Sequence, residues 1–325
     1  MKNFWLKLKK SAKGGQAIYA LAPMAGVTDS AFRQICKGFS ADVLYSEMAS
    51  ATALAYNPQK TLEMLKFSKV ERPYVVQSFG SNPEHFEIAA KLITSHPLLA
   101  SPSGRGRNMP DGIDINFGCP VKKIQKQGAG AVLMDNPKLA REIIKSVIDS
   151  TSLPVSIKIR SKVGETDALK FLDYMRGLDI KAVMIHGRTL NQGFSGSIDT
   201  EVIKKARDYF GGIILANGGV NSYDDAVKIL DATKADGIGI ARGALGKPWI
   251  FEDLRFKNNN SRSKKEIYKI ALKHAKLAYE LKGRQGIIEM RKHLCWYVQG
   301  LPGAKTLRNE LVHVTTLKDI KRILK

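Results

Sequence analysis

The sequence predicts an α/β protein in which residues 1–255 form an eight-stranded parallel β/α barrel and residues 256–325 form a smaller all-helical domain. Three observations support this fold. Eight short apolar runs recur in the first part of the chain, and helix-like segments alternate with them, as in a (β/α)8 barrel. No Gly-x-Gly-x-x-Gly motif follows the first run, which disfavours the competing doubly wound open sheet. After residue 256 the apolar pattern becomes purely helical.

The predicted strands follow one another as AIYALAP (17–23), ADVLYSE (41–47), PYVVQSFG (73–80), GIDINFG (112–118), PVSIKIR (154–160), KAVMIHG (181–187), GIILANGG (212–219) and ADGIGIARG (235–243). Helical patterns lie between them at residues 83–93, 137–148, 167–178 and 222–232. Helix-start signals precede three of these patterns, namely Asn82-Pro83, Asn136-Pro137 and Asn221-Ser222. Alternating strands and helices predict parallel pairing of the strands.

Three segments interrupt the alternation. Residues 1–15 are basic and partly apolar, without the apolar run of a signal peptide, and we expect a solvated arm there. Residues 95–112 are rich in Pro, Gly and Arg and predict a long loop, in which Arg105 and Arg107 are more simply solvated than bound to a phosphate. Residues 256–266 predict a linker to the helical domain.

The charge of the chain points to a polyanionic partner. The 325 residues are 44% hydrophobic, which is enough for a large core, and the net charge is +22. Residues 256–325 contain 17 Lys or Arg against five Asp or Glu, so this part alone carries +12. Concentrated positive charge is typical of proteins that bind nucleic acid or a membrane surface, although a general solubility charge would also explain it. No stretch approaches the ~18 apolar residues of a membrane span, and we expect no membrane partner.

The cysteines indicate a reducing setting. There are three, Cys36, Cys119 and Cys295, at wide spacings and without a Cys-x-x-Cys motif. An odd number at such spacings fits neither a disulfide framework nor a zinc cluster. We therefore expect no disulfide, no bound metal and a cytoplasmic location.

Functional side chains gather at the carboxyl ends of the predicted strands. In a β/α barrel the active site is built there, from the loops that follow the strands. A strand has no structural need to end in this way, so the pattern predicts a functional site. In chain order the ends carry Pro23-Met24-Ala25, Glu47, Gln77, Asn116 with Cys119, Lys158 with Arg160, His186 with Arg188, Asn217, and Arg242.

The last two strands end in glycine-rich loops that predict a phosphate site. Residues 216–220 and 239–248 expose backbone N–H groups before a helix start, which favours an anion. Arg242 would add a charge-assisted contact to that anion. The alternative is two tight turns that merely need glycine.

Two further strand-end residues fit a bound cofactor. Alternation along the fifth strand points Lys158 into the barrel mouth, where a buried ammonium needs a negative partner. A reduced flavin, a phosphate or a carboxylate such as Glu47 would serve, and a Schiff-base lysine is a rival role. His186 has no second ligand at metal-binding spacing, so we predict a hydrogen bond to a cofactor or substrate.

Cys119 lies just past the fourth strand, between Gly118 and Pro120. A thiolate nucleophile at this place would need a base or cationic surroundings that lower its pKa. A thiol acid would instead have to stay protonated, and the ordinary pKa of ~8.5 already leaves most of the thiol as S–H near neutral pH. The sequence leaves both roles open.

Taken together, these motifs resemble one family, the flavin-dependent tRNA-dihydrouridine synthases, and look most like its bacterial B-type. The resemblance runs from about residue 18 to 310, and NFGCP, HGRT and GALGKPWIF in this order make it specific. The motifs are LAPMAGVTD (21–29), VQSFG (76–80), DINFGCPVKKI (114–124), GAG (128–130), KIR (158–160), IHGRT (185–189), ANGG (216–219), GIARGALGKPWIF (239–251) and RKHLCWYVQGLPGAK (291–305).

The resemblance implies a TIM barrel that carries FMN, a helical tRNA-binding domain, and NADPH or NADH as reductant. It implies that a uridine of tRNA receives a hydride at C6 from reduced flavin and a proton at C5 from Cys119. The flavin would contact Pro23, Met24, Ala25, Gln77, Lys158 and His186. Its ribityl phosphate would lie at Asn217, Gly218, Gly219, Ala241 and Arg242. The uracil would be read by Asn116, Lys158 and Arg160.

Two positions depart from the family pattern, and other functions stay open. Gly219 stands where the family usually has an acidic residue, and Ala241 replaces the glycine of its usual Gly-Arg pair. The main alternative is an FMN-dependent barrel oxidoreductase of a small pyrimidine or enone, which leaves the basic helical tail unexplained. A non-catalytic tRNA-binding protein and a flavin-free aldolase with Lys158 as Schiff base are the others. We expect no obligate protein partner, since the sequence shows no sign of one.

Overall fold

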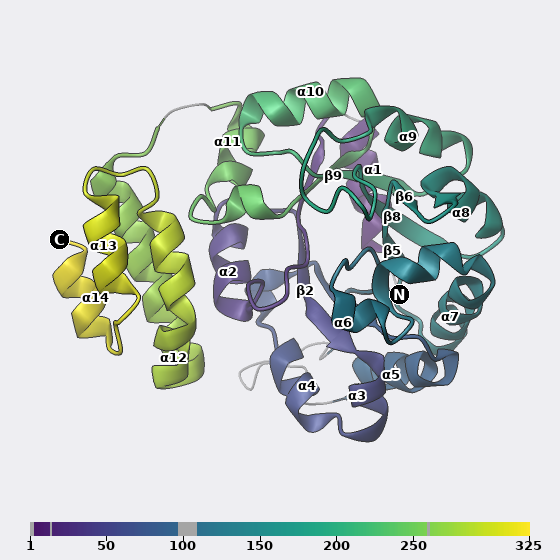
Figure 1. Cartoon of the computed structure of the whole chain (residues 1–325), viewed down its shortest axis with the longest axis horizontal. Coiled ribbons are helices and arrows are strands. Elements are labelled where there is room, and N and C mark those ends of the chain that lie inside the picture. Colours follow the sequence, from purple (N-terminus) through teal and green to yellow (C-terminus); the bar gives the residue numbers. More distant parts are fainter. Residues whose placement is uncertain (1–2, 14, 97–108, 259–260) are drawn as a thin grey trace.

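Eight parallel strands close into a barrel in the order β1-β10-β9-β8-β5-β4-β3-β2 (Figure 1). The computed structural model describes residues 3–13, 15–96, 109–258 and 261–325. β1 pairs with both β2 and β10, which closes the sheet and confirms the predicted barrel. The barrel strands are β1 (Ile18–Leu21), β2 (Val43–Ser50), β3 (Tyr74–Phe79), β4 (Gly112–Phe117), β5 (Val155–Arg160), β8 (Ile180–His186), β9 (Ile213–Asn217) and β10 (Gly237–Ile240).

Helices surround the barrel. The three helices whose starts the sequence predicts each begin at a residue whose side chain caps the helix N-terminus. Asn82 accepts hydrogen bonds from the backbone of Glu84 and His85, and Asn136 accepts one from Leu139. In the third case the cap is Ser222 of the predicted pair Asn221-Ser222, and its side chain accepts from the backbone of Asp225. The outer helices are α2 (Ser30–Gly38), α3 (Ala51–Tyr56), α4 (Gln59–Leu65), α5 (Pro83–Ser95), α7 (Pro137–Ser150), α8 (Ala168–Tyr174), α9 (Thr200–Lys205), α10 (Tyr223–Thr233) and α11 (Ile250–Phe256).

Alternation along the strands separates the barrel interior from the helix-facing core. On β8, Ala182 and Met184 belong to the interior cluster, whereas Val183 and Ile185 pack in the cluster shared with the outer helices. The next inward position after Met184 is His186, at the carboxyl end of the strand. The period-two pattern therefore carries polar side chains to the upper end of an otherwise apolar interior. The loop expected over residues 95–112, with Arg105 and Arg107, lies mostly outside the described residues.

The N-terminal segment is a helix, not the solvated arm that the sequence predicts. α1 (Phe4–Lys13) buries Trp5, which is 1% exposed and packs with the barrel-interior residues Ile18 and Ile213. The indole belongs to the same buried apolar cluster as Ile18 and Ala20 of β1, so it forms part of the barrel core. The many basic residues of this segment suggested a solvated arm. The helix is nevertheless anchored to the barrel by the aromatic side chains at its start, Phe4 and Trp5.

Replacing Trp5 with alanine is expected to destabilise the barrel by about 3 to 5 kcal/mol, because it removes a fully buried aromatic side chain and leaves a cavity. The neighbouring Leu6 is 58% exposed, so Leu6→Ala is the matched control and should change stability by less than about 0.5 kcal/mol. Urea unfolding followed by tryptophan-independent circular dichroism measures both. Equal stability of the two variants would contradict the conclusion that Trp5 anchors α1 in the barrel core.

The C-terminal region is helical and has its own apolar cluster. It consists of α12 (Lys264–Tyr297), α13 (Ala304–Leu311) and α14 (Leu317–Ile323). α12 kinks at Gly283, whose φ of +57° is a left-handed conformation that glycine adopts without strain. The cluster of these helices includes Ala31 of α2, so the helices pack against one side of the barrel (Figure 1). None of the helices in the described part of the chain is both long enough and apolar enough to cross a bilayer.

Candidate functional site

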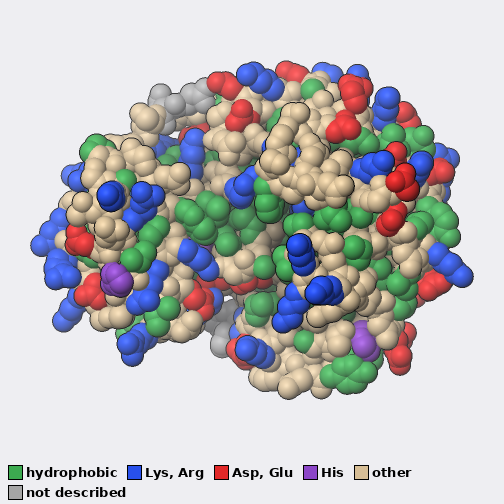
Figure 2. Space-filling model, in the orientation of Figure 1, with side chains coloured by type: hydrophobic (Ala, Val, Ile, Leu, Met, Phe, Trp, Pro, Cys, Tyr) green, Lys and Arg blue, Asp and Glu red, His purple; other side chains and the backbone are tan. Residues whose placement is uncertain are grey.

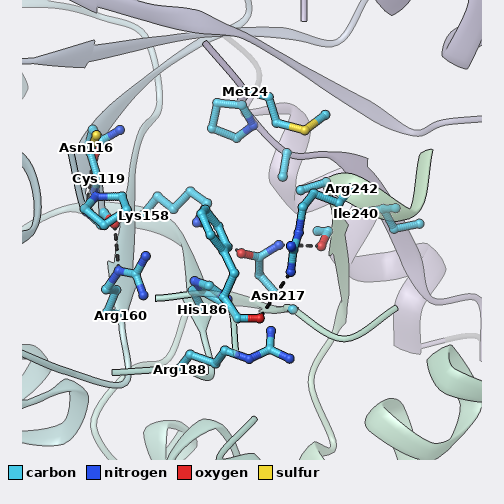
Figure 3. A pocket seen from close by; sticks show the side chains of 18 of the residues that line it. Met24, Asn116, Cys119, Lys158, Arg160, His186, Arg188, Asn217, Ile240 and Arg242 are labelled. Atoms are coloured by element: carbon cyan, nitrogen blue, oxygen red, sulfur yellow. Dashed lines mark hydrogen bonds between the residues drawn. The ribbon is translucent and has the colours of Figure 1, made fainter. Parts of the chain in front are cut away.

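A cavity of about 350 Å³ lies at the carboxyl ends of the barrel strands (Figure 3). It brings together every residue that the sequence assigned to catalysis, cofactor or substrate: Pro23, Met24, Ala25, Gln77, Asn116, Cys119, Lys158, Arg160, His186, Asn217, Gly218, Gly219, Ala241 and Arg242. Strand register places several of them side by side. Asn116 is paired with Lys158, and His186 with Asn217.

One strand end was predicted wrongly. Glu47 does not line this cavity; it accepts a hydrogen bond from the backbone N–H of Gly26 and faces a second cavity beside α12. The pairing of β2 with β3 shifts between Tyr45 and Met48, which moves the inward position one residue along the chain. Met48 takes the place instead, with its sulfur 3.7 Å from Asn116 Nδ2. Glu47 is therefore not the partner of Lys158.

A chain of buried hydrogen bonds positions the Cys119 loop. Asp114 is fully buried and accepts from Ser156 Oγ at 2.6 Å and from Gln77 Nε2 at 2.7 Å. Gln77 Oε1 in turn accepts from Asn116 Nδ2 at 2.8 Å. Burial raises the pKa of Asp114 to about 6, although its hydrogen bonds favour the charged form. Sequence reasoning missed Asp114 and Ser156, whose only signal is a polar residue at an inward strand position.

Asn116 links this chain of hydrogen bonds to the Cys119 loop. Its side-chain Oδ1 accepts hydrogen bonds from the backbone N–H groups of Gly118 at 3.0 Å and Cys119 at 2.9 Å. On the other side, the carbonyl of Cys119 accepts from Ala131 N at 3.1 Å, and a Cβ at Gly130 would lie only 3.1 Å from Cys119. The loop is thus held on both sides, and the cysteine cannot drift relative to the barrel.

The surroundings of Cys119 favour a protonated thiol. Cys119 is 9% exposed, and burial raises the pKa of its thiol above the ordinary value. The backbone of Val121 and the cations Arg160 and Lys158 oppose this shift without reversing it. A thiol with a raised pKa stays as S–H at neutral pH, which suits a proton donor better than a thiolate nucleophile.

Lys158 is a buried cation whose hydrogen-bond partner is neutral. Its Nζ donates to Asn217 Oδ1 at 3.1 Å, and Asn217 Nδ2 donates to the carbonyl of Gly239 at 2.7 Å. Burial, together with the charge of Arg160, lowers the pKa of Lys158 to about 8. No carboxylate in the described part of the chain forms an ion pair with this lysine. The cavity therefore offers a positive charge to an anionic or electron-rich ligand.

The cavity wall formed by the loops after β8, β9 and β10 carries several cations and several glycines. Burial, followed by the charges of Lys158, Arg160, Arg188 and Arg242, lowers the pKa of His186 to about 2, so this ring is neutral near pH 7. Arg242 stacks on the ring of Phe194 at 4.6 Å and donates to the Phe194 carbonyl at 3.4 Å. Sequence reasoning missed Phe194, because it lies in a loop that reaches the cavity from a distance along the chain.

In the loops after β9 and β10, two glycines have no room for a Cβ, so the backbone itself forms a cradle. Gly218 has φ of +108°, and a Cβ there would lie 2.8 Å from the His186 ring. A Cβ at Gly243 would lie 2.1 Å from the carbonyl of Val220. Exposed backbone beside Arg242 in this corner of a β/α barrel fits a phosphate. Across the described ranges, no three His, Cys, Asp or Glu residues gather in a way that could hold a metal ion.

Arg160 connects two loops of the site. It is 1% exposed, its Nε donates to the carbonyl of Gly118 at 2.8 Å, and its Nη1 donates to the carbonyls of Thr189 and Gly193 at 2.9 and 3.2 Å. These bonds tie the Cys119 loop to the loop after β8. Arg160, which the sequence predicts to contact the uracil, therefore also holds two loops together beside Cys119.

Comparison with known proteins relates the chain to one family. The family model described as Dihydrouridine synthase (Dus) matches residues 20–325. A "Probable tRNA-dihydrouridine synthase" of Aquifex aeolicus is 32% identical over 318 residues, which cover 96% of this chain and 96% of the relative. The "tRNA-dihydrouridine synthase B" of Pasteurella multocida is 32% identical over 307 residues, which cover 92% and 89%.

Solved structures support the fold. The old yellow enzyme homologue from Zymomonas mobilis superposes with a TM-score of 0.54 at 12% identity, over 76% of this chain and 90% of that chain. A histamine dehydrogenase from Rhizobium sp. 4-9 superposes with a TM-score of 0.52 at 12% identity, over 80% and 48%. At these identities the likeness concerns the barrel architecture alone.

Proposed function

Because the chain belongs to the dihydrouridine synthase family, we propose that it reduces the C5–C6 bond of uridine in tRNA with the help of bound FMN. The observation that carries this proposal is one cavity that brings together the buried thiol of Cys119, the buried lysine Lys158 and the glycine-rich loops beside Arg242. A wall of this composition fits a flavin phosphate on one side and a nucleobase on the other. When bound, reduced FMN supplies the hydride for C6 of the uracil, and NADPH is the proposed reductant.

Different residues of this chain would bind different parts of the cofactor. Arg242 and the backbone of Gly218 and Gly219 would hold the phosphate, since together they offer a charged donor and exposed N–H groups. Lys158 would hold the electron-rich edge of the ring. Pro23, Met24, Ala25, Gln77, His186, Asn217 and Ala241 complete the proposed cofactor wall.

Cys119 is the proposed acid. Hydride addition at C6 leaves an electron pair at C5, and the S–H bond of Cys119 breaks to supply the proton that forms the C5–H bond. The product gains two hydrogen atoms, and the thiolate that remains takes its proton back from solvent. The positive charges of Arg160 and Lys158 stabilise that thiolate, since both lower the pKa of Cys119.

Asn116 and Arg160 are the proposed readers of the uracil, and each also keeps Cys119 in place. Asn116 aligns the backbone of Cys119, and Arg160 holds the preceding carbonyl of Gly118. Substituting either would thus disturb both base recognition and proton transfer. A uridine inside folded RNA must leave its stack to reach this cavity, and the +12 charge of residues 256–325 would supply sequence-independent affinity for the RNA.

Affinity for FMN is expected to fall as the pH rises above about 8. Burial and Arg160 set the pKa of Lys158 at about 8, and an electron-rich ligand beside the ammonium would raise that pKa. Above pH 8, binding must therefore take up a proton, and affinity drops by as much as about tenfold per pH unit. Near pH 7 the lysine is charged in both states, so this contribution is flat. Flavin fluorescence titrations at several pH values measure the profile, and constant affinity through this range would contradict it.

The proposed function is tested in a bacterial strain that lacks dihydrouridine in its tRNA. Expression of this chain should restore dihydrouridine at one or more positions, which mass spectrometry of digested tRNA identifies. Production of folded, flavin-bearing protein without any dihydrouridine would refute the proposal. In that outcome, turnover of a free pyrimidine or enone by the same protein would favour the small-molecule alternative.

A further inference from the structure

Three lysines stand on the single helical turn that follows the cysteine. α6 (Lys122–Gln125) begins three residues after Cys119, and Lys122, Lys123 and Lys126 are all exposed. None of the three forms an ion pair or a side-chain hydrogen bond with any residue that the structure describes. By contrast, Lys158 donates to Asn217, and Lys292 of α12 donates to the carbonyl of Gly26.

α6 is fixed to the Cys119 loop by packing and by hydrogen bonds. Ile124 is 9% exposed and packs with Cys119 and Ala129 in a small apolar cluster. Gln125 Nε2 donates to the carbonyl of Pro120 at 2.7 Å, and Ala129 N donates to the carbonyl of Ile124 at 3.2 Å. One face of the turn is therefore buried on the catalytic loop, so the three lysines occupy a defined place beside the cavity.

The position of α6 relative to the cavity decides what these lysines can meet. Val121, the residue before α6, lines the cavity and is 50% exposed, so the helix rises from the rim. Lys and Arg side chains gather over α6, and others gather over α12–α14 across the same face of the molecule (Figure 2). A uridine that enters the cavity must bring the phosphates on either side of it over this rim.

We propose that Lys122, Lys123 and Lys126 bind the RNA phosphates that flank the reacting uridine. The inference rests on the proposed function and adds a second contact region to it, separate from the basic helices α12–α14. The physical reason is that a nucleotide extruded into the cavity brings its two flanking phosphates to the mouth of the cavity. Three unpaired ammonium groups on a rigid turn neutralise them without reading sequence.

The proposal is tested with K122Q/K123Q/K126Q against a matched control. K204Q/K205Q/K228Q removes the same charge from exposed positions on α9 and α10, in the outer helical layer. Binding of unmodified tRNA transcript by FMN-loaded protein is measured over a range of salt concentrations. The α6 variant should bind about tenfold more weakly near 0.1 M salt, and its salt slope should fall by about 1.4, since two flanking phosphates lose their contacts and each contact on a single strand contributes about 0.7. The control should stay within about twofold of wild type.

A second measurement identifies the phosphates. Methylphosphonate linkages on both sides of the reacting uridine remove the charges that α6 is proposed to contact. They should weaken binding to wild type about tenfold and hardly affect the α6 variant, because the two changes delete the same interaction. Equal effects of the α6 and control substitutions on tRNA binding, or additive effects of the linkages and the α6 variant, would overturn the proposal. Failure of the proposed function would show differently, as wild-type protein that forms no dihydrouridine.

Discussion

Replacing Cys119 with alanine is expected to lower the rate of dihydrouridine formation by about 100- to 10,000-fold, the range that a positioned general acid contributes. The thiol is buried, its pKa is raised, and its backbone is held by Asn116 and Ala131. Neither Cys36 nor Cys295 lines the cavity, so neither thiol can take its place. The measurement is a single-turnover reaction of pre-reduced, FMN-loaded protein with tRNA, followed by mass spectrometry of the nucleosides.

The matched control is Cys295→Ala on α12, a half-buried cysteine outside the cavity, which should leave the rate within about twofold of wild type. Flavin content and tRNA affinity of Cys119→Ala should also match wild type, because the residue is proposed to act in proton transfer. Undiminished dihydrouridine formation by Cys119→Ala would remove this residue from the mechanism. A loss of flavin would instead show that the change disrupts the cavity.

Replacing Lys158 with methionine is expected to weaken FMN binding by about 10- to 100-fold, which corresponds to the loss of one buried charge-assisted hydrogen bond. Methionine is similar in length and keeps the apolar stem, so the change removes charge with little loss of volume. It also frees Asn217, which accepts from Lys158 at 3.1 Å. The second expected result is more specific: the fall of FMN affinity above pH 8 should disappear, because its titrating group is gone.

Lys162→Met is the control for this experiment, since Lys162 is exposed on the short strand β6 (Lys162–Val163), four residues further along the chain. It should keep both the affinity and the pH profile of wild type. An unchanged affinity of Lys158→Met at pH 7 would assign the ammonium to another ligand. A persisting drop above pH 8 would assign the titration to another group.

The barrel and most of its site could be predicted because both follow from local pattern. Buried parallel strands read as apolar runs, and their ends converge on one face, so side chains such as Gln77, Asn116 and His186 could be assigned to one site without knowing any distance. Alternation placed Lys158 inside the barrel mouth, and the register of β4 with β5 sets it beside Asn116. The family resemblance then suggested which of these residues would meet flavin and which would meet uracil.

The remaining features depend on tertiary structure that no local pattern encodes. A register shift in β2 turned Glu47 away and brought Met48 to the cavity, and nothing in the sequence marks where a bulge falls. Trp5 belongs to the core only because the barrel leaves an apolar space for it. Phe194 reaches the cavity through a long loop, and the partners of Asp114 lie on two neighbouring strands.

The proposed reduction of uridine within tRNA can be tested with purified components. Wild-type protein, FMN and NADPH are incubated with an unmodified tRNA transcript, and the transcript is digested and analysed by mass spectrometry. We expect at least one uridine to gain two hydrogen atoms, in a reaction that needs reductant and is slowed by about 100-fold or more in Cys119→Ala. A flavin-loaded protein that oxidises NADPH and binds the transcript, yet leaves every uridine unchanged, would contradict it.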